Sequence, residues 1–322
     1  MSNNSTHHCL APQGLVATAL PPILIIEFLL GLPGNAMALW VFCCHPQAWR
    51  PNTVYLLNLV LADFLLLSGL PLRIDNLLRG ENWVHGDALC RLNLFMLAVN
   101  RSASIAFMTA VAVDRYLKVA HPHHRVNRMS SRRAGAAAGV VWSAVVLLRA
   151  PLLAEPLLWR HGDRMLCRSF SSYRKTSAVL QLHYGVYVAE FFLPLPVLVF
   201  CAAGINRVLR RRRLDRERKV RRAMWSVVVI ATVFGVCFLP GVATGLTALL
   251  VQKLLPHDCD SLLLVGQIFS LSIGFTYLNS TLDPVLYCFS SSAFRNTLLS
   301  AAGRLGVLRH WANRKESVAS EG

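Results

Sequence analysis

Residues 90–116 read CRLNLFMLAVNRSASIAFMTAVAVDRY, an apolar run with one cation, Arg101, inside it. A helix rises about 1.5 Å per residue, so this run is slightly longer than the roughly 30 Å hydrocarbon core of a bilayer, and its ends face different compartments. An arginine at such depth costs about 3 kcal/mol on insertion scales. We therefore expect Arg101 to face the interior of a helix bundle, where it meets a partner or a ligand.

The composition places the whole chain in a membrane. Of its 322 residues, 54% are hydrophobic and 15% are charged, and the mean hydropathy is +0.46. Seven apolar runs exceed the roughly 20 residues that a spanning helix needs. They cover approximately residues 18–43, 53–79, 88–119, 133–156, 179–209, 221–250 and 261–289.

These runs predict an all-α membrane protein with a seven-transmembrane helix bundle over residues 18–289. Residues 1–17 then form an extracellular N-terminus. Residues 290–322 form a cytoplasmic region, which begins with a short amphipathic eighth helix along the inner membrane interface.

The distribution of basic residues gives the orientation. The net charge is +17, and Lys and Arg are dense at residues 118–133 and 207–222 but absent from residues 1–17. The positive-inside rule therefore places the N-terminus outside the cell and the C-terminus inside. Topology thus explains the positive charge without nucleic acid as a partner. The chain begins without the features of a cleavable signal peptide, and Asn3 and Asn4 each start an N-glycosylation sequon.

Charged side chains inside the runs leave alternatives open. Arg149 and Glu190 are expected to pair between adjacent helices, as intramembrane charges tend to do. Arg101 either binds a ligand or is permanently neutralised by Glu27 or Glu190. Arg73, near the outer end of the second run, either reaches the membrane interface or faces a pocket. The basic outer stretch at 157–178 is either a solvated loop or a field that draws anionic ligands.

Four of the nine cysteines map to the outer side, and these are Cys9, Cys90, Cys167 and Cys259. That compartment is oxidising, so disulfides are the natural assignment, and three pairings remain open. The other cysteines lie in or beside apolar runs, where they serve as small buried residues.

Several motifs occur in order on the predicted spans. They are GNxxAL at 34–39, LxxxD at 59–63, Cys90, DRY at 114–116, Trp142, FxxP at 191–194, CFLP at 237–240 and NSxLDPVLY at 279–287. With them the chain resembles a rhodopsin-like (class A) G protein-coupled receptor over residues 15–305. The segments around Arg101, CRSFS at 167–171, EFFLPLPVLVFC and FTYLNSTLDPVLYCFSS resemble, more narrowly, the hydroxycarboxylic acid and oxoeicosanoid receptor family.

This resemblance implies the ligand and the residues that hold it. In that family an arginine of the third helix binds the ligand carboxylate, and Arg101 matches it. The ligand is then an oxidised fatty acid or a small hydroxycarboxylic acid. The expected ligand-binding residues are Arg101, Arg73, Asn76, Ser169, Phe170 and Tyr277. The resemblance also favours the disulfides Cys90–Cys167 and Cys9–Cys259.

The resemblance further implies how the receptor would signal. Asp114 holds Arg115 until the sixth helix moves and frees Arg115 for a G protein. The activation residues are Asp114, Arg115, Tyr116, Phe238, Pro240, Asp283, Pro284 and Tyr287, with Phe238 standing where the family usually has tryptophan. An allosteric sodium ion is expected at Asn35, Asp63, Ser104, Asn279 and Asp283. The implied partners are a heterotrimeric G protein of the inhibitory Gi/o class, which lowers cyclic AMP, and arrestin.

Two other classes compete with this interpretation. A class A receptor for nucleotides or peptides would use the same cationic pocket. A membrane transporter would show inverted repeats and broken helices that pair at the midplane, and the sequence has neither. An enzyme is excluded because no nucleophile with a base and no metal-ligand set is evident; His121, His123 and His124 belong to a solvated loop.

Overall fold

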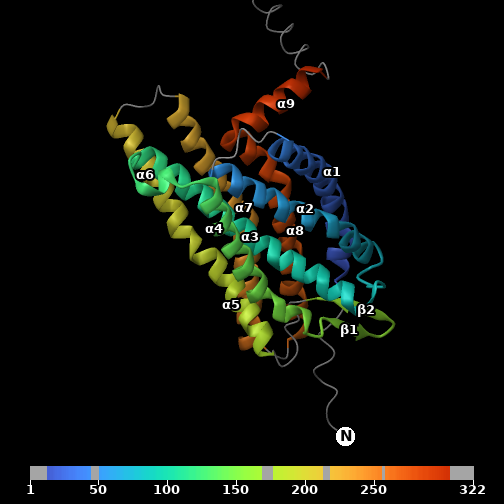
Figure 1. Cartoon of the computed structure of the whole chain (residues 1–322). Helices are drawn as coiled ribbons and strands as arrows, with labels where there is room; N and C mark the ends of the chain where they lie inside the picture. Colours follow the sequence, from blue (N-terminus) through green and yellow to red (C-terminus); the bar gives the residue numbers. More distant parts are fainter. Residues whose placement is uncertain (1–12, 45–50, 169–176, 213–217, 256–257, 305–322) are drawn as a thin grey trace, which may run out of the picture.

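The computed structural model describes residues 13–44, 51–168, 177–212, 218–255 and 258–304. Seven segments in this part of the chain are long and apolar enough to cross a membrane, which confirms the predicted bundle. The spans are α1 (Gly14–Cys44), α2 (Pro51–Leu78), α3 (Gly86–Ala120), α4 (Ser131–Arg149), α5 with α6 (Ala178–Phe192 and Pro194–Arg212), α7 (Arg218–Leu254) and α8 (Cys259–Ser290) (Figure 1). The predicted short helix after them is α9 (Ser292–Arg304).

The fifth span is divided into two helices at Leu193. Pro194 follows directly and begins α6, where its missing N–H would have no intrahelical partner in any case. The amide of Leu193 still donates to the carbonyl of Ala189 at 2.9 Å, so α5 ends as a regular turn. Prolines also lie inside α1, α2, α7 and α8, and these helices remain continuous.

The two ends of the bundle differ in structure. At one end β1 (Leu158–His161) pairs antiparallel with β2 (Arg164–Cys167), and Gly162 makes the turn with φ +57°. We call this the hairpin end. The sequence predicted only a loop at residues 157–178. At the opposite end, which we call the α9 end, the short helix η2 (Arg125–Arg128) connects α3 to α4, and α9 extends away from the bundle (Figure 1).

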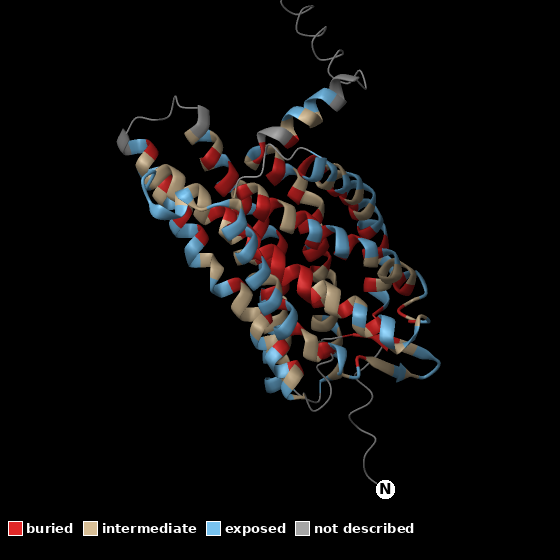
Figure 2. Cartoon of the chain, viewed as in Figure 1, coloured by how far each residue is buried: buried red, intermediate tan, exposed pale blue. Residues whose placement is uncertain are grey.

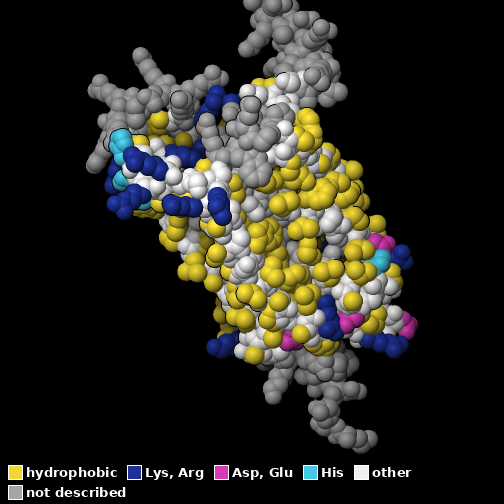
Figure 3. Space-filling view, viewed as in Figure 1, with side chains coloured by type: hydrophobic (Ala, Val, Ile, Leu, Met, Phe, Trp, Pro, Cys, Tyr) yellow, Lys and Arg dark blue, Asp and Glu magenta, His cyan; other side chains and the backbone are white. Residues whose placement is uncertain are grey.

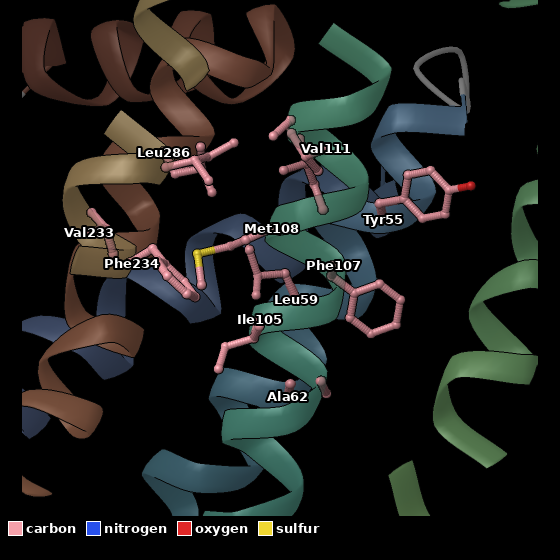
Figure 4. Close-up of a cluster of buried hydrophobic side chains, with 14 of the residues drawn as sticks. Tyr55, Leu59, Ala62, Ile105, Phe107, Met108, Val111, Val233, Phe234 and Leu286 are labelled. Atoms are coloured by element: carbon pink, nitrogen blue, oxygen red, sulfur yellow. The ribbon is translucent and has the colours of Figure 1, made fainter. Parts of the chain in front are cut away.

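The helix α3 is central to the bundle. In its most apolar window 61% of the residues are buried, against 22–50% in the other spans. Figure 2 shows that the buried residues are concentrated along the middle of the bundle. Figure 4 shows Ile105 and Met108 of α3 beside Leu59 of α2, Phe234 of α7 and Leu286 of α8, all of them buried. Functional groups on α3 are therefore placed within reach of most other helices.

The outer surface of the bundle is apolar around its middle. Large exposed hydrophobic side chains include Leu30, Leu147, Leu193 and Phe200. Figure 3 shows this hydrophobic belt, with Lys and Arg gathered towards the two ends. Such a belt fits the hydrocarbon region of a bilayer, where the backbone of each helix satisfies its own hydrogen bonds.

One glycine shows how closely the first and last spans approach. A Cβ atom added at Gly34 of α1 would lie 2.7 Å from Cγ of Pro284 in α8. Only a residue without a side chain fits there. The GNxxAL and DPVLY motifs therefore pack against each other.

Candidate functional site

The guanidinium of Arg101 lies inside the bundle, as expected. Arg101 is 3% exposed, and its Nη2 donates to the carbonyl of Tyr187 at 3.3 Å. Its Nε lies 3.6 Å from Oε2 of Glu190. The guanidinium carbon is 3.9 Å from the ring centre of Tyr187 and 4.9 Å from that of Phe238. The charge therefore lies between α5 and α7 and points away from lipid.

Glu190 contacts two arginines, Arg149 and Arg101. Its Oε1 lies 2.6 Å from Nη2 of Arg149, which confirms the expected pair, and it also accepts from the hydroxyl of Ser102. Arg149 further donates to Ser102 at 3.1 Å and contacts Nδ1 of His183 at 2.8 Å. We call Arg101, Arg149 and Glu190 the charge cluster. With two guanidinium groups and one carboxylate among the described residues, this cluster carries one positive charge in excess.

The structure supports only part of the alternative in which Arg101 is permanently neutralised by Glu27 or Glu190. Glu190 does contact Arg101, but at a longer distance than it contacts Arg149. Glu27 forms no ion pair with any described residue. The Nη1 atom of Arg101 is buried and has no hydrogen-bond acceptor among the described residues. Arg101 thus keeps donor capacity for a further acceptor.

A cavity adjoins the charge cluster, and we call it the Arg101 cavity. Its lining is Leu94, Leu97, Ala98, Arg101, Arg149, His183, Tyr187, Ile273 and Thr276. Thr276 is 2% exposed, and its hydroxyl has no hydrogen-bond partner within the described chain. The cavity therefore combines four apolar residues with two guanidinium groups and the hydroxyl of Thr276, which suits a small anionic group.

A second cavity, the Arg73 cavity, adjoins the first. The two share Leu94, Leu97 and Ile273. Arg73 and Tyr277, both expected in the binding site, line this second cavity.

The other expected ligand-binding residues differ in where they lie. Asn76 lines neither cavity; it is buried, and its main-chain carbonyl accepts from the amide of Glu81 at 3.0 Å. Ser169 and Phe170 lie outside the described residues.

The hairpin end is fixed by covalent and ionic contacts. Cys90 of α3 and Cys167 of β2 form the expected disulfide. The next residue, Arg168, forms a buried ion pair with Glu81, whose carboxylate also accepts from the amide of Gln13 at 2.6 Å. Cys259 is also in a disulfide.

Two further sequence predictions concern residues before Gln13. The expected partner of Cys259, Cys9, lies outside the described residues. The sequons at Asn3 and Asn4 lie there as well.

The residues expected to hold sodium lie together in the middle of the bundle. Asp63 accepts from the hydroxyls of Ser280 at 2.8 Å and Tyr287 at 2.9 Å. The amide of Asn279 donates to Asp283 at 3.2 Å, and the neighbouring carboxyl groups of Asp283 and Asp63 are both fully buried.

Of the other two expected sodium residues, Asn35 belongs to the same group, and Ser104 is buried on α3. Asn35 donates to the carbonyl of Ser280 at 2.7 Å. Oxygen atoms of Ser104, Asn279 and Asp283 are buried without a hydrogen-bond partner in the described part of the chain.

The prediction that Asp114 holds Arg115 is wrong. Asp114 pairs with Lys118 at 2.7 Å, because residues four apart lie on one face of a helix. Arg115 instead donates through Nη2 to the carbonyl of Ser290 at 2.7 Å, and the hydroxyl of Ser290 lies 2.5 Å from that of Ser226. Ser290 therefore joins α3, α7 and α8 at the α9 end.

The remaining expected activation residues occupy the interior or the α9 end. The ring of Tyr116 packs against Phe200 of α6, with 5.2 Å between centres. Phe238 is fully buried below Arg101 and packs against Phe234 at 5.6 Å. Pro240 lies inside α7, where its carbonyl accepts from Thr244 at 2.7 Å.

Sequence reasoning missed several residues of this site. Thr276 and His183 line the Arg101 cavity, and Glu81 holds Arg168 at the hairpin end. Thr276 and His183 are polar residues inside apolar runs, and this pattern could have indicated that they belong to the site. Lys118 was visible as a cation four residues after Asp114.

Comparison with known proteins gives the same architecture. The profile described as "7 transmembrane receptor (rhodopsin family)" matches residues 34–287. Hydroxycarboxylic acid receptor 2 of Homo sapiens is 42% identical over 89% of this chain and 78% of its own. Oxoeicosanoid receptor 1 of Homo sapiens is 42% identical over 96% of this chain and 82% of its own. The 12-(S)-hydroxy-5,8,10,14-eicosatetraenoic acid receptor of Mus musculus is 35% identical over 92% of this chain and 94% of its own.

Proposed function

Because the chain belongs to the rhodopsin family of seven-transmembrane receptors, and within it to the hydroxycarboxylic acid and oxoeicosanoid receptors, we propose that it is activated by a carboxylic acid whose carboxylate binds Arg101. As a G protein-coupled receptor it is not an enzyme. The observation that carries the proposal is the excess positive charge of the charge cluster beside a cavity.

The physical reason is charge compensation in a place that water reaches poorly. A buried guanidinium without full compensation is costly, and a carboxylate offers it a charge-assisted, bidentate hydrogen-bond pair. Arg101 has the donor for this, since its Nη1 has no acceptor among the described residues. The hydroxyl of Thr276 lines the same cavity and offers one further hydrogen bond to the ligand.

The competing classes are less well supported. A nucleotide would need partners for its base and ribose as well as for several phosphates, whereas the charged groups that line the Arg101 cavity are the two guanidinium groups of Arg101 and Arg149. A transporter would pair two broken helices, whereas among the described spans only the fifth is divided. The two arginines of this lining, with Leu94, Leu97, Ala98 and Ile273 beside them, support a carboxylate attached to an apolar body.

The signal would pass to a heterotrimeric G protein at the α9 end, and the Gi/o class, with lowered cyclic AMP, is part of the proposal. The exposed cations Arg125, Arg128, Arg132 and Arg133 at that end support its position on the cytoplasmic side. The N-terminus would then be extracellular in the plasma membrane, with glycans on Asn3 or Asn4. Arrestin would bind the same face as the G protein.

We also propose that a sodium ion binds among Asp63, Asp283, Ser104 and Asn279. Two neighbouring buried carboxyl groups are both ionised only if a cation compensates them; otherwise they share a proton. The unpartnered oxygen atoms of this group are ligands of the kind that hard cations prefer. Bound there, sodium would supply positive charge to the carboxylates.

The test of the carboxylate site is a cyclic AMP assay in cells that express the chain or its Arg101→Gln variant. The matched control is Arg91→Gln, on the same helix but paired with Asp87 and outside both cavities. Loss of a buried charge-assisted pair costs about 3 kcal/mol, so we expect about a hundredfold loss of potency in Arg101→Gln and little change in Arg91→Gln.

The ligand panel is a set of carboxylic acids, their methyl esters and nucleotides. The methyl esters should be inactive on every variant. An acid that keeps full potency on Arg101→Gln would overturn the proposal. Sensitivity of the response to pertussis toxin tests the G protein class separately.

A further inference from the structure

A third cavity lies between α5, α7 and α8 near the hairpin end, and we call it the Tyr184 cavity. Helix α7 contributes Gly245, Ala248 and Leu249 to it, and α8 contributes four residues that include Phe269. Arg168 lines its edge, where Glu81 already compensates that charge. The larger part of this lining is therefore apolar or small.

The three cavities are neighbours that share lining residues. The Arg101 and Arg73 cavities adjoin, and the Arg73 and Tyr184 cavities share Arg168, Phe269 and Ser270. A ligand that binds Arg101 and extends past the Arg73 cavity would therefore end between α5, α7 and α8.

The route bends around a pair of aromatic rings. Tyr187 lines both the Arg101 and the Tyr184 cavities, and its ring centre lies 6.1 Å from that of Phe269. These two rings separate the ends of the route. A chain with cis double bonds loses less conformational freedom in a bent path than a saturated chain does.

Small residues of α7 keep the Tyr184 cavity open. A Cβ atom at Gly245 would already lie 3.1 Å from Cε2 of Phe269. Any side chain there would close the space against Phe269. Ala248, one turn further on, also presents a single methyl group. Larger residues at either position would shorten the space for a ligand.

We propose that the Tyr184 cavity binds the hydrocarbon tail of a long-chain monocarboxylic acid, so that the ligand belongs to the fatty-acid class and not to the short hydroxy acids. This inference rests on the proposed function, because the carboxylate end is assigned to Arg101. A short acid fills the Arg101 cavity alone and leaves the two others without contact. A long acid gains free energy from every methylene group that it buries.

The test is a chain-length profile on Ala248→Phe, which fills the Tyr184 cavity. The matched control is Ala243→Phe, on the same helix but exposed and outside the three cavities. Potency is measured without albumin for straight-chain acids from butanoate to icosanoate and for one cis-unsaturated long-chain acid. In the natural chain we expect about a fourfold gain per methylene group until the route is full.

In Ala248→Phe the gain should stop at a shorter chain, with at least about a tenfold loss for the longest acids and less than about a twofold change for butanoate. Ala243→Phe should follow the natural chain. An equal shift at all lengths, or a natural chain that only short acids activate, would overturn the inference. If the Phe variant does not reach the cell surface, Ala248→Leu makes a smaller change of the same kind.

Failure of this inference and failure of the proposed function give different results. If long acids act but ignore Ala248→Phe, while Arg101→Gln abolishes their effect, the carboxylate site stands and the tail lies elsewhere. If no acid depends on Arg101, the proposed function itself is wrong.

Discussion

Substitutions that change the net charge of the charge cluster by one unit should change the affinity for a carboxylic acid in a definite order. Glu190→Gln removes the carboxylate and leaves two arginines. Arg149→Gln leaves Glu190 to pair with Arg101 alone, so that the cluster becomes neutral. For a carboxylic acid we expect the affinity to rise in Glu190→Gln and to fall in Arg149→Gln, relative to the natural chain. The methyl ester of the same acid should not follow this order.

The size of each step follows from the geometry. Glu190 lies 3.6 Å from Nε of Arg101, and a ligand carboxylate at hydrogen-bonding distance on the open side would lie about 6 to 7 Å from Glu190. At an effective dielectric constant of about 20, a unit charge at that distance changes the binding free energy by about 2.5 kcal/mol. The expected gain in affinity for Glu190→Gln is therefore about seventyfold, and Arg149→Gln should change the affinity in the opposite direction.

Both substitutions also lower stability, because each removes one partner of a buried pair. Glu190→Gln leaves Arg149 and Arg101 without a carboxylate, which costs about 3 to 5 kcal/mol of unfolding free energy. A bound acid should restore part of this loss, so the ligand should raise the melting temperature of Glu190→Gln more than that of the natural chain.

The assay is competition binding on purified receptor, with thermal unfolding followed in parallel. Glu155→Gln is the control, because Glu155 accepts a hydrogen bond from Ser177 away from the charge cluster. The reasoning is refuted if Glu190→Gln binds the acid no better than Glu155→Gln does. An equal response of acid and methyl ester would refute it as well.

Three other substitutions test separate parts of the site. Thr276→Val removes an unpartnered hydroxyl from the Arg101 cavity, so the potency of acids should fall about threefold to tenfold in the cyclic AMP assay. The control Thr247→Val, on the exposed side of α7, should leave the potency unchanged. Ser226→Ala breaks the contact between α7 and α8, so ligand-independent signalling should rise about fivefold, and Ser300→Ala on α9 should leave it unchanged. Asp63→Asn should abolish any effect of sodium chloride on agonist affinity, with potassium chloride as the ionic-strength control; sodium sensitivity that persists would contradict the sodium site.

Much of the fold could be predicted because membrane spans are long and continuous in the sequence. Every predicted run corresponds to a described span. The division at Leu193 was indicated by Pro194 and Pro196 but could not be separated from a simple kink. The hairpin was missed because strands of four residues carry little periodicity, although Gly162 marks its turn.

The individual charged residues of the site could be predicted from the sequence, but the ion pairs that they form could not. Arg101 stands out because a cation inside an apolar run is costly. Whether Glu190 would bind Arg101, Arg149 or both depends on the rotation and tilt of α3, α4 and α5, which no local pattern fixes. The wrong prediction that Asp114 pairs with Arg115 could, in contrast, have been avoided from local spacing. Local spacing already placed Lys118 on the same face, and the family pattern was given more weight.

The position of Phe238 links the ligand site to the α9 end. The guanidinium of Arg101 lies over this ring, so a carboxylate that binds Arg101 weakens the attraction between the cation and the aromatic ring. Phe238 lies two residues before Pro240, where α7 lacks a backbone donor and bends most easily. The same helix carries Ser226, whose hydroxyl contacts Ser290. A change in the contact at Phe238 can therefore alter the hydrogen bond at Ser226, because both lie on one continuous helix with a flexible point near Arg101.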